Sequence, residues 1–369
     1  MWAIALNESP LYTLKLSFNA SGEAARRILS TAWLFKLACH RVLNKSKGLI
    51  DHLVPSKVAW LKVFYDDARA YIPNKRYAYG AVYLVYGVWQ SAGELKVDYK
   101  NVELSDWLLF QHYEREVDGN VIRVSEDGST LITTYSYDGS KDRVFIRARP
   151  NRGHAGLLKL VVESKEKYMP KVVVKGYNVR DGTLYLRGEL HVAVSYSFYL
   201  KHSTRYREPR GGLVGGVDVN ADRINLAIVD RKGNLRDYKT FLFAETTARG
   251  YPRRGAWSVI GMKIHEMLEY AYHHGVSAIA LEGPEVLGYL KSAWMRGDDR
   301  SHENYNYKKA VFRSSLIERI AMKAPLYGLS VEFVNPRGTT SSVERDEAMR
   351  RYGLDKHTAS AYLIALRCI

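Results

Sequence analysis

Residues 211–369 contain a series of short apolar segments, and their order restricts the fold more than any other feature of the sequence. Three strands are predicted first, at 214–217, about 223–230 and about 235–243. They are followed by a helix (about 256–274), a strand (277–282), a helix (about 303–325), a strand (330–334) and a helix from about residue 355. A three-stranded meander followed by alternating helices and strands predicts one mixed sheet with helices on its faces.

Three acidic residues lie at the ends of these predicted elements. Asp218 follows the first apolar strand in GGVDVN, Glu282 ends the strand AIALEG, and Asp355 opens the last helix. A sheet rich in parallel strands gathers such ends at one edge, so the three carboxylates are predicted to converge there. Carboxylates are hard oxygen ligands suited to Mg²⁺ or Mn²⁺. Two such ions about 4 Å apart activate a water and stabilise the leaving 3′ oxygen of a phosphodiester.

Each of these residues also has an ordinary structural explanation. An aspartate at a helix start, such as Asp355, is commonly an N-cap, and a glutamate before Gly-Pro, such as Glu282, can mark a solvated strand end. Asp218 differs because it follows an apolar run that is expected to be buried, where an unpaired charge is costly. Glu285 competes for the role of Glu282, which we prefer because it directly continues the apolar strand.

The chain is strongly basic, with 55 Lys and Arg residues against 39 Asp and Glu residues and a formal net charge of +16. Most of the excess positive charge lies in residues 1–210. A protein with this balance usually has a polyanionic partner, so the front half is predicted to bind the polyanion. The back half keeps the carboxylates that a metal-dependent site requires.

Several protein classes are excluded by the same sequence. It has no run of about 18 apolar residues that would span a membrane, and its start lacks the pattern of a secretory signal. Its two cysteines, Cys39 and Cys368, form neither a disulfide scaffold nor a CxxC…CxxC zinc site. We therefore expect a cytoplasmic protein without a membrane partner.

The front half is predicted to be a β domain with a helical insertion. A strand at 11–18 precedes helical stretches, and Asp181-Gly182 predicts a hairpin in a later, β-rich part. The other short strands are expected at about 121–124, 130–137, 143–149 and 156–163. We expect three domains: a barrel-like nucleic-acid-binding domain (1–20 and 97–206), an inserted helical recognition domain (21–96) and, after a linker at 207–212, a third domain (211–369).

Basic side chains that contact nucleic acid are predicted in three places. Lys75 and Arg76 precede an aromatic-rich helix, where rings and cations together suit base stacking and phosphate contact. The densest run alternates along VFIRARPNR, which favours salt-dependent contact with a phosphate backbone, and contains Arg143, Arg147, Arg149 and Arg152. Arg253 and Arg254 are the candidates of the back half. The alternative for the aromatic rings is that they pack a helical core. The alternative for the basic side chains is that they lie on a solvated face without contacting nucleic acid.

The back half resembles a known family at its motifs. The acidic trio lies within GGVDVNADRINLAIVDRKGNL, AIALEGPEVL and VEFVNPRGTTSS…YGLDKHTASAYLIA. The order of strands and helices is that of an RNase H-like mixed sheet. The motifs resemble the split RuvC-type nuclease domain of TnpB, the OrfB protein of insertion-sequence transposons, which is related to the type V CRISPR effectors. The resemblance covers residues 211–369 closely, and the front half is similar only in its arrangement.

The resemblance implies an RNA-guided DNA endonuclease that depends on Mg²⁺ or Mn²⁺. Asp218, Glu282 and Asp355 would be its metal-binding catalytic trio. Its partners would be a guide RNA derived from the transposon end and a target DNA, bound by a protein monomer. The β domain would hold the RNA scaffold, and the helical unit would hold the guide–target heteroduplex.

Two departures from the family pattern bear on this function. The interval SVERDEAMRRYGL contains no cysteine where the family carries a four-cysteine zinc ribbon, so no zinc is expected. Asn220 stands where the first motif usually has a small glycine, which is expected to crowd the metal edge. Two alternatives are therefore kept: an RNA-guided DNA-binding protein with a weakened nuclease, and an unguided RuvC-like nuclease selective for branched DNA.

Overall fold

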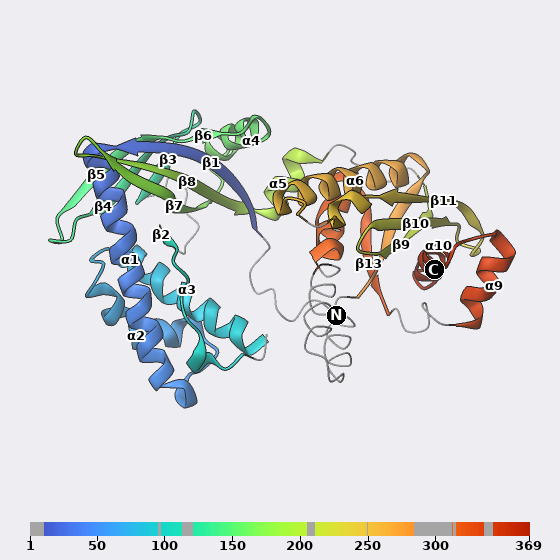
Figure 1. Ribbon diagram of the computed structural model, residues 1–369, viewed down its shortest axis with the longest axis horizontal. Coiled ribbons are helices and arrows are strands. Elements are labelled where there is room, and N and C mark those ends of the chain that lie inside the picture. The colour runs from blue at the N-terminus through green and yellow to red at the C-terminus, as the bar shows by residue number, and fades with distance from the viewer. Residues whose placement is uncertain are drawn as a thin grey trace. The chain divides into compact units, whose positions relative to one another are not determined.

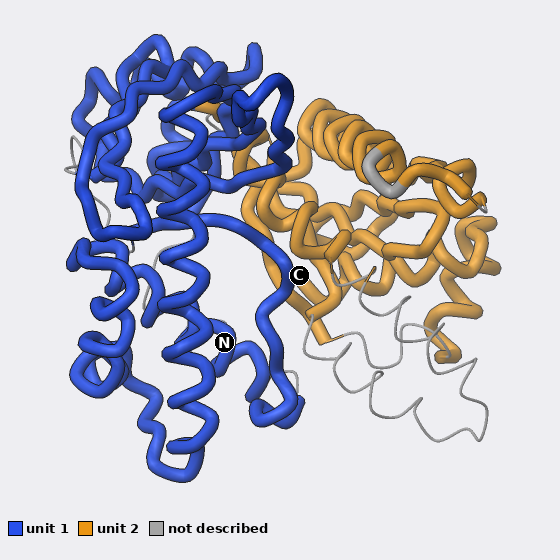
Figure 2. The backbone as a smooth tube through the Cα atoms, turned by 60° about the vertical axis from the view of Figure 1, so that its left-hand side comes forward, with its two compact units in different colours: residues 1–202 blue, residues 203–369 orange. Residues whose placement is uncertain are grey.

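The structure of the protein is a computed structural model, shown in Figure 1. It describes residues 11–94, 97–112, 121–204, 211–248, 250–283, 312, 315–335 and 342–369, without the side chains of residues 94, 253 and 254. The chain divides into two compact units, residues 1–202 and 203–369, which Figure 2 distinguishes by colour. None of the helices within the described ranges is both long and apolar enough to cross a membrane.

The first unit is built from antiparallel strands and helices. Its strands are β1 (Leu11–Ser21), β2 (Leu108–Gln111), β3 (Ile122–Val124), β4 (Ser129–Tyr135), β5 (Lys141–Arg147), β6 (Arg149–Pro150), β7 (Met169–Arg180) and β8 (Thr183–Ser195). Its helices are α1 (Gly22–Gly48), α2 (Lys57–Arg69), α3 (Lys75–Glu94), α4 (Arg152–Glu163) and α5 (Tyr196–Ser203). The three helices α1 to α3 follow β1 directly, where the sequence predicts the helical insertion.

A five-stranded sheet in the order β2-β7-β8-β1-β6 forms the centre of this unit. Strand β1 pairs with β8 along its whole length, from Leu11 opposite Ser195 to Ser21 opposite Tyr185. The predicted hairpin is confirmed: β7 and β8 are joined at Asp181-Gly182, and both residues have positive φ values, 47° and 72°. A two-residue turn with positive φ at both positions matches the right-handed twist of the strands it joins.

The strands predicted for one barrel-like domain form two separate sheets in the described residues. Strands β3, β4 and β5 pair only with one another in a separate three-stranded sheet. The tight turns at Gly128 and Gly139, both with positive φ, return each strand to its immediate neighbour. Each of these short strands forms its backbone hydrogen bonds with the neighbour to which a tight turn joins it. None of the three therefore needs to pair with the longer sheet.

Residues 156–163 form a helix, and the predicted strand there is wrong. They belong to α4, whose buried side chains Leu157, Leu158 and Val161 recur at helical rather than alternating spacing. The helix is started by Asn151, whose side-chain oxygen accepts a hydrogen bond from the backbone N–H of His154 at 2.9 Å. Arg152 therefore begins a helix and does not continue the strand that carries Arg143 and Arg147.

The helices of the first unit confirm that many aromatic rings pack a core. Trp60 of α2 and Tyr77 of α3 are almost completely buried, and the Tyr77 hydroxyl donates to the backbone oxygen of Thr133 at 2.8 Å. Ser56 caps α2 by accepting from the backbone N–H of Ala59. Ser21 occupies the N-cap position of α1, but its side chain makes no capping bond.

Gly80 lets helix α3 approach strand β2 closely. A Cβ atom at Gly80 would lie 2.1 Å from the backbone oxygen of Gln111, whereas a Cβ at Gly87 of the same helix meets nothing within 4 Å. We expect Gly80→Ala to lower the free energy of unfolding by about 1–3 kcal/mol because backbone must move. The matched control Gly87→Ala is expected to raise it by about 0.5–1 kcal/mol. Urea unfolding measures both, and a Gly80→Ala variant as stable as the parent would contradict the close contact.

The second unit is a mixed α/β unit. Its strands are β9 (Leu213–Val219), β10 (Arg223–Val229), β11 (Leu235–Leu242), β12 (Val276–Glu282) and β13 (Ser330–Val334). Its helices are α6 (Arg253–His273), α9 (Val343–Tyr352) and α10 (Lys356–Leu366), and residues 315–323 are also helical. Helix α9 lies within the interval SVERDEAMRRYGL, which contains no cysteine.

One five-stranded sheet in the order β11-β10-β9-β12-β13 organises this unit. Strands β9, β10 and β11 form the predicted antiparallel meander, and β12 runs parallel to both β9 and β13. Helix α10 covers one face, where Ala361 and Ile364 pack with Val214, Ala227 and Ala280 of the strands. Helix α6 lies along the opposite face (Figure 1). The sheet thus has its central strand, β9, between its antiparallel and its parallel part.

Candidate active site

The face of the sheet beneath α10 carries Asp218 and Glu282. Ala280 packs in the apolar cluster with α10, and a Cβ at Gly216 would meet the backbone oxygen of Ala361 in α10 at 2.1 Å. Because side chains alternate along a strand, Asp218 and Glu282, two residues further on, face the same side. Both side chains are buried, with 3% and 5% of their surface exposed. Two acidic side chains are thus buried on the same face of the sheet.

Strand register extends these carboxylates into a row across the sheet. Asn225 of β10 pairs directly with Asp218 of β9 on one side and with Thr240 of β11 on the other. On the other side of β9, Leu281 of β12 pairs with Val217 of β9. The next residue of each strand therefore places Glu282 beside Asp218. Residues directly opposite on neighbouring strands share a face. The row therefore reads Glu282, Asp218, Asn225 and Thr240.

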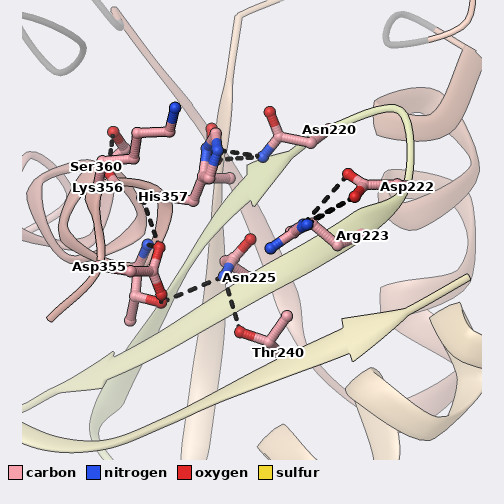
Figure 3. Close-up of polar contacts among 11 residues, drawn as sticks. Asn220, Asp222, Arg223, Asn225, Thr240, Asp355, Lys356, His357 and Ser360 are labelled. Atoms are coloured by element: carbon pink, nitrogen blue, oxygen red, sulfur yellow. Dashed lines mark hydrogen bonds and ion pairs between the residues drawn. The ribbon is translucent and has the colours of Figure 1, made fainter. Parts of the chain in front are cut away.

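The N-terminus of α10 is attached to this row by hydrogen bonds (Figure 3). Asp355 caps the helix, and its Oδ1 accepts from the backbone N–H groups of His357 at 2.8 Å and Thr358 at 3.1 Å. The Thr358 hydroxyl lies 2.7 Å from Asp355 Oδ2, to which it donates, and accepts from the amide of Asn225 at 3.2 Å. The same amide nitrogen donates to the Thr240 hydroxyl at 2.8 Å. The helix cap and the strands β10 and β11 thus form one polar network.

Two polar side chains lie close to the Asp218 carboxylate. The Asn220 amide donates to Asp218 Oδ2 at 2.6 Å, and Nδ1 of His357 lies 3.3 Å from the same oxygen. Asn220 and His357 are themselves 3.2 Å apart. Asn220 therefore holds the Asp218 carboxylate instead of only filling space at this edge, and that hydrogen bond is not available to a glycine.

The carboxyl group of Asp355 is held in its charged form. Partial burial favours the neutral acid, but the hydrogen bonds from the Thr358 hydroxyl, the Thr358 N–H and the His357 N–H outweigh burial and lower the pKa of Asp355. A lowered pKa in the folded state contributes stability above the unfolded-state pKa. That contribution is lost as the pH falls through the pKa of the folded state.

Of the predicted acidic trio, Asp218 and Glu282 lie on one face of the sheet, and Asp355 caps the helix that covers this face. Within the described chain, no group of three or more His, Cys, Asp or Glu side chains is arranged to hold a metal ion. Asp355 lies above the row with both oxygens engaged in the helix cap. The assignment of the trio as metal ligands stays a prediction, and Glu285 falls outside the described residues.

The sequence interpretation missed Asn225, Thr240 and Thr358. Asn225 is the one polar residue in the segment 224–229 of β10, whose other residues are apolar and buried. A buried polar residue in such a strand needs a partner, and this rule was the available signal. Its actual partner, Thr358, is 133 residues away and follows only from the packing of α10.

The predicted basic contacts are distributed over several elements of the structure. Lys75 is exposed with its Nζ 5.4 Å from the centre of the Tyr79 ring, and Arg76 is half-buried. The exposed members of the densest run lie on β5 (Arg143, Arg147), β6 (Arg149) and α4 (Arg152). Arg253 and Arg254 open α6, and their side chains lie outside the described part.

Two of these arginines line a cavity together with a third that the sequence interpretation missed. The cavity has a volume of about 450 Å³ and is lined by Ser17, Phe18, Asn19, Arg147, Arg149 and Arg187. Arg149 pairs across the sheet with Ser17, and Arg187 with Asn19. Among the described residues, none of the three arginines forms an ion pair. This clustering leaves three positive charges available for an anion.

Comparison with known proteins yields relatives without an assigned function. No family model matches the chain. Two uncharacterized proteins of Aeropyrum pernix are each 48% identical over 357 residues, covering 97% of this chain and 96% and 85% of their own lengths. An uncharacterized protein of Saccharolobus solfataricus is 31% identical over 178 residues, which is 48% of this chain and 47% of that protein. Among solved structures, T. thermophilus RuvC in complex with a Holliday junction substrate matches at 18% identity and a TM-score of 0.29, covering 42% of this chain and 90% of that one. With 48% identity over nearly its whole length, the chain belongs to the same family as the two Aeropyrum pernix proteins.

Proposed function

We propose that the second unit is an RNase H-like, RuvC-type nuclease domain that hydrolyses DNA phosphodiesters. The observation that carries this proposal is the pair of buried carboxylates, Asp218 and Glu282, on neighbouring parallel strands beneath a helix that begins at Asp355. The sequence resemblance to the nuclease domain of TnpB proteins assigns catalysis to the same three residues. In this proposal the protein is guided to its DNA by a bound RNA, as in that family.

The donor chemistry of this face fits a divalent cation. Asp218 and Glu282 are hard oxygen donors that lie buried on one face of the sheet, and Mg²⁺ or Mn²⁺ suits such donors. The bound metal would supply an activated water and stabilise the leaving oxygen. Asp218 and Glu282 would hold it from the sheet, and Asp355 from the helix.

Cleavage assays on the full-length protein test this proposal. The protein is purified with any RNA that accompanies it and is then incubated with linear and branched DNA, in Mg²⁺ or in EDTA. We expect Mg²⁺-dependent cleavage of DNA complementary to the bound RNA. Cleavage of branched DNA after removal of the RNA would instead identify an unguided nuclease. Binding without cleavage in Mg²⁺ would identify a guided binding protein whose nuclease has weakened.

We further propose that the arginine cavity of the first unit binds phosphates of the RNA. Each phosphate contact by an arginine releases condensed counterions, so affinity falls as salt rises. Substituting Arg147, Arg149 and Arg187 singly by alanine is expected to reduce the slope of log affinity against log salt by about 1 each. The control is Arg26→Ala, because Arg26 is exposed on α1 and 3.9 Å from Glu23. Fluorescence anisotropy with the co-purifying RNA measures the slopes. Equal slopes for parent and cavity variants would remove the cavity from the interface.

A further inference from the structure

Asn225 places an unsatisfied oxygen in the middle of the acidic row. The residue is only 1% exposed, and its Oδ1 atom is buried without a hydrogen-bond partner in the described chain. Asn225 lies directly opposite Asp218, where Cβ atoms are about 5 Å apart. Buried amide oxygens are nearly always satisfied, so this atom calls for an explanation.

The orientation of the Asn225 amide is determined by its neighbours. The Thr358 hydroxyl has one hydrogen, which it gives to the ionised Asp355, so it must accept from Asn225. The nitrogen of Asn225 therefore faces Thr358 and Thr240. Figure 3 shows the oxygen turned the opposite way, to the side on which Asn220 and His357 lie. Those two residues are the neighbours of the Asp218 carboxylate.

We propose that the carbonyl oxygen of Asn225 is an additional ligand of the divalent cation held by Asp218. This inference rests on the proposed metal-dependent function and adds a residue to its site. Amide carbonyls are ordinary oxygen ligands of Mg²⁺, Mn²⁺ and Ca²⁺. A neutral ligand completes the coordination without adding a third negative charge to the buried row of Asp218 and Glu282. The two threonines hold the amide so that its oxygen stays turned to the cation.

Mn²⁺ titrations of the full-length protein test this assignment, read out by electron paramagnetic resonance of free Mn²⁺ and by thermal shift. Asn225→Leu removes the oxygen, and we expect at least tenfold weaker Mn²⁺ binding, the size of effect seen for groups that support metal sites. Asn225→Asp keeps an oxygen at the same place and adds charge, so it is expected to bind Mn²⁺ at least as tightly as the parent. Asp222→Asn is the control, because Asp222 lies in the β9–β10 turn and is paired with Arg223 at 2.6 Å. It should leave Mn²⁺ affinity unchanged within twofold.

Three results would overturn the assignment. One is Asn225→Leu with parental Mn²⁺ affinity, which means that a water or the fold alone accounts for the oxygen. Another is equal loss of binding in Asn225→Asp and Asn225→Leu, which means that only the donor side of the amide matters. The third result is parental Mn²⁺ affinity in Asp218→Asn, which refutes the metal site as a whole. If Asn225→Leu does not fold, Asn225→Ala replaces it in these comparisons. Loss of binding in Asp218→Asn but not in Asn225→Leu refutes the role of Asn225 alone.

Discussion

Asp218→Asn is expected to abolish DNA cleavage while making the metal-free protein more stable. The substitution keeps the shape of the side chain and removes the charge that would hold the cation. We expect the cleavage rate in Mg²⁺ to fall by about 10³-fold or more, equivalent to about 4 kcal/mol of transition-state stabilisation. Single-turnover cleavage with saturating RNA and protein measures this loss. Binding of RNA should be unchanged, because the basic cavity is formed by other residues.

The expected gain in stability of the metal-free Asp218→Asn variant follows from the burial of Asp218. Asp218 is 3% exposed and lies beside Glu282, which is 5% exposed, so a charged oxygen is kept away from water next to a second acidic group. In EDTA at pH 8 we expect Asp218→Asn to raise the free energy of unfolding by about 1–3 kcal/mol. In Mg²⁺ the order reverses, because only the parent gains binding energy from the ion.

Asp222→Asn is the matched control for the Asp218 variant. Asp222 lies in the β9–β10 turn and forms an ion pair with Arg223 at 2.6 Å, with about a third of its side chain exposed. Exposed pairs contribute about 0–1 kcal/mol, so its loss is expected to lower stability slightly and to leave cleavage intact. If Asp218→Asn cuts DNA at the parental rate, or unfolds more easily than the parent in EDTA, the buried carboxylate site is wrong.

Gly216→Ala is expected to be the most destabilising single substitution of the second unit. A Cβ there would lie 2.1 Å from the backbone oxygen of Ala361 and 2.4 Å from the backbone nitrogen of Ala365. Both contacts are with the backbone of α10, so no side chain can rotate away and the helix itself must move. We expect a loss of about 3 kcal/mol in the free energy of unfolding. Displacement of α10 also carries Asp355 away from the row, so cleavage should fall with stability.

Gly261→Ala in α6 separates the contact from the general effect of replacing glycine. A Cβ at Gly261 meets nothing within 4 Å, and alanine favours the helix by about 0.5–1 kcal/mol. Urea unfolding of the two variants should therefore move the midpoint in opposite directions. Equal midpoints for Gly216→Ala and the parent would show that α10 does not rest directly on β9.

Sequence patterns over a few residues were sufficient to predict those helices, strands and turns whose structure depends mainly on their own residues. The short apolar runs before Asp218 and Glu282 predicted strands β9 and β12, and Asp181-Gly182 predicted the β7–β8 hairpin, because these signals act over a few residues. The same local interpretation failed at α4, where an apolar run without clear alternation was assigned to a strand. The N-cap hydrogen bond of Asn151 stabilises a helix at these residues.

The sequence by itself determined that the second unit is a meander followed by helix–strand alternation, and that acidic residues end its strands. Only the tertiary structure decided which side chains of distant elements contact one another. Register placed Asn225 opposite Asp218, and the absence of a side chain at Gly216 let α10 settle on the sheet. That packing brought Thr358 to Asn225 across 133 residues of chain. Hydrogen bonds over such separations depend on the positions of whole elements, which no local periodicity encodes.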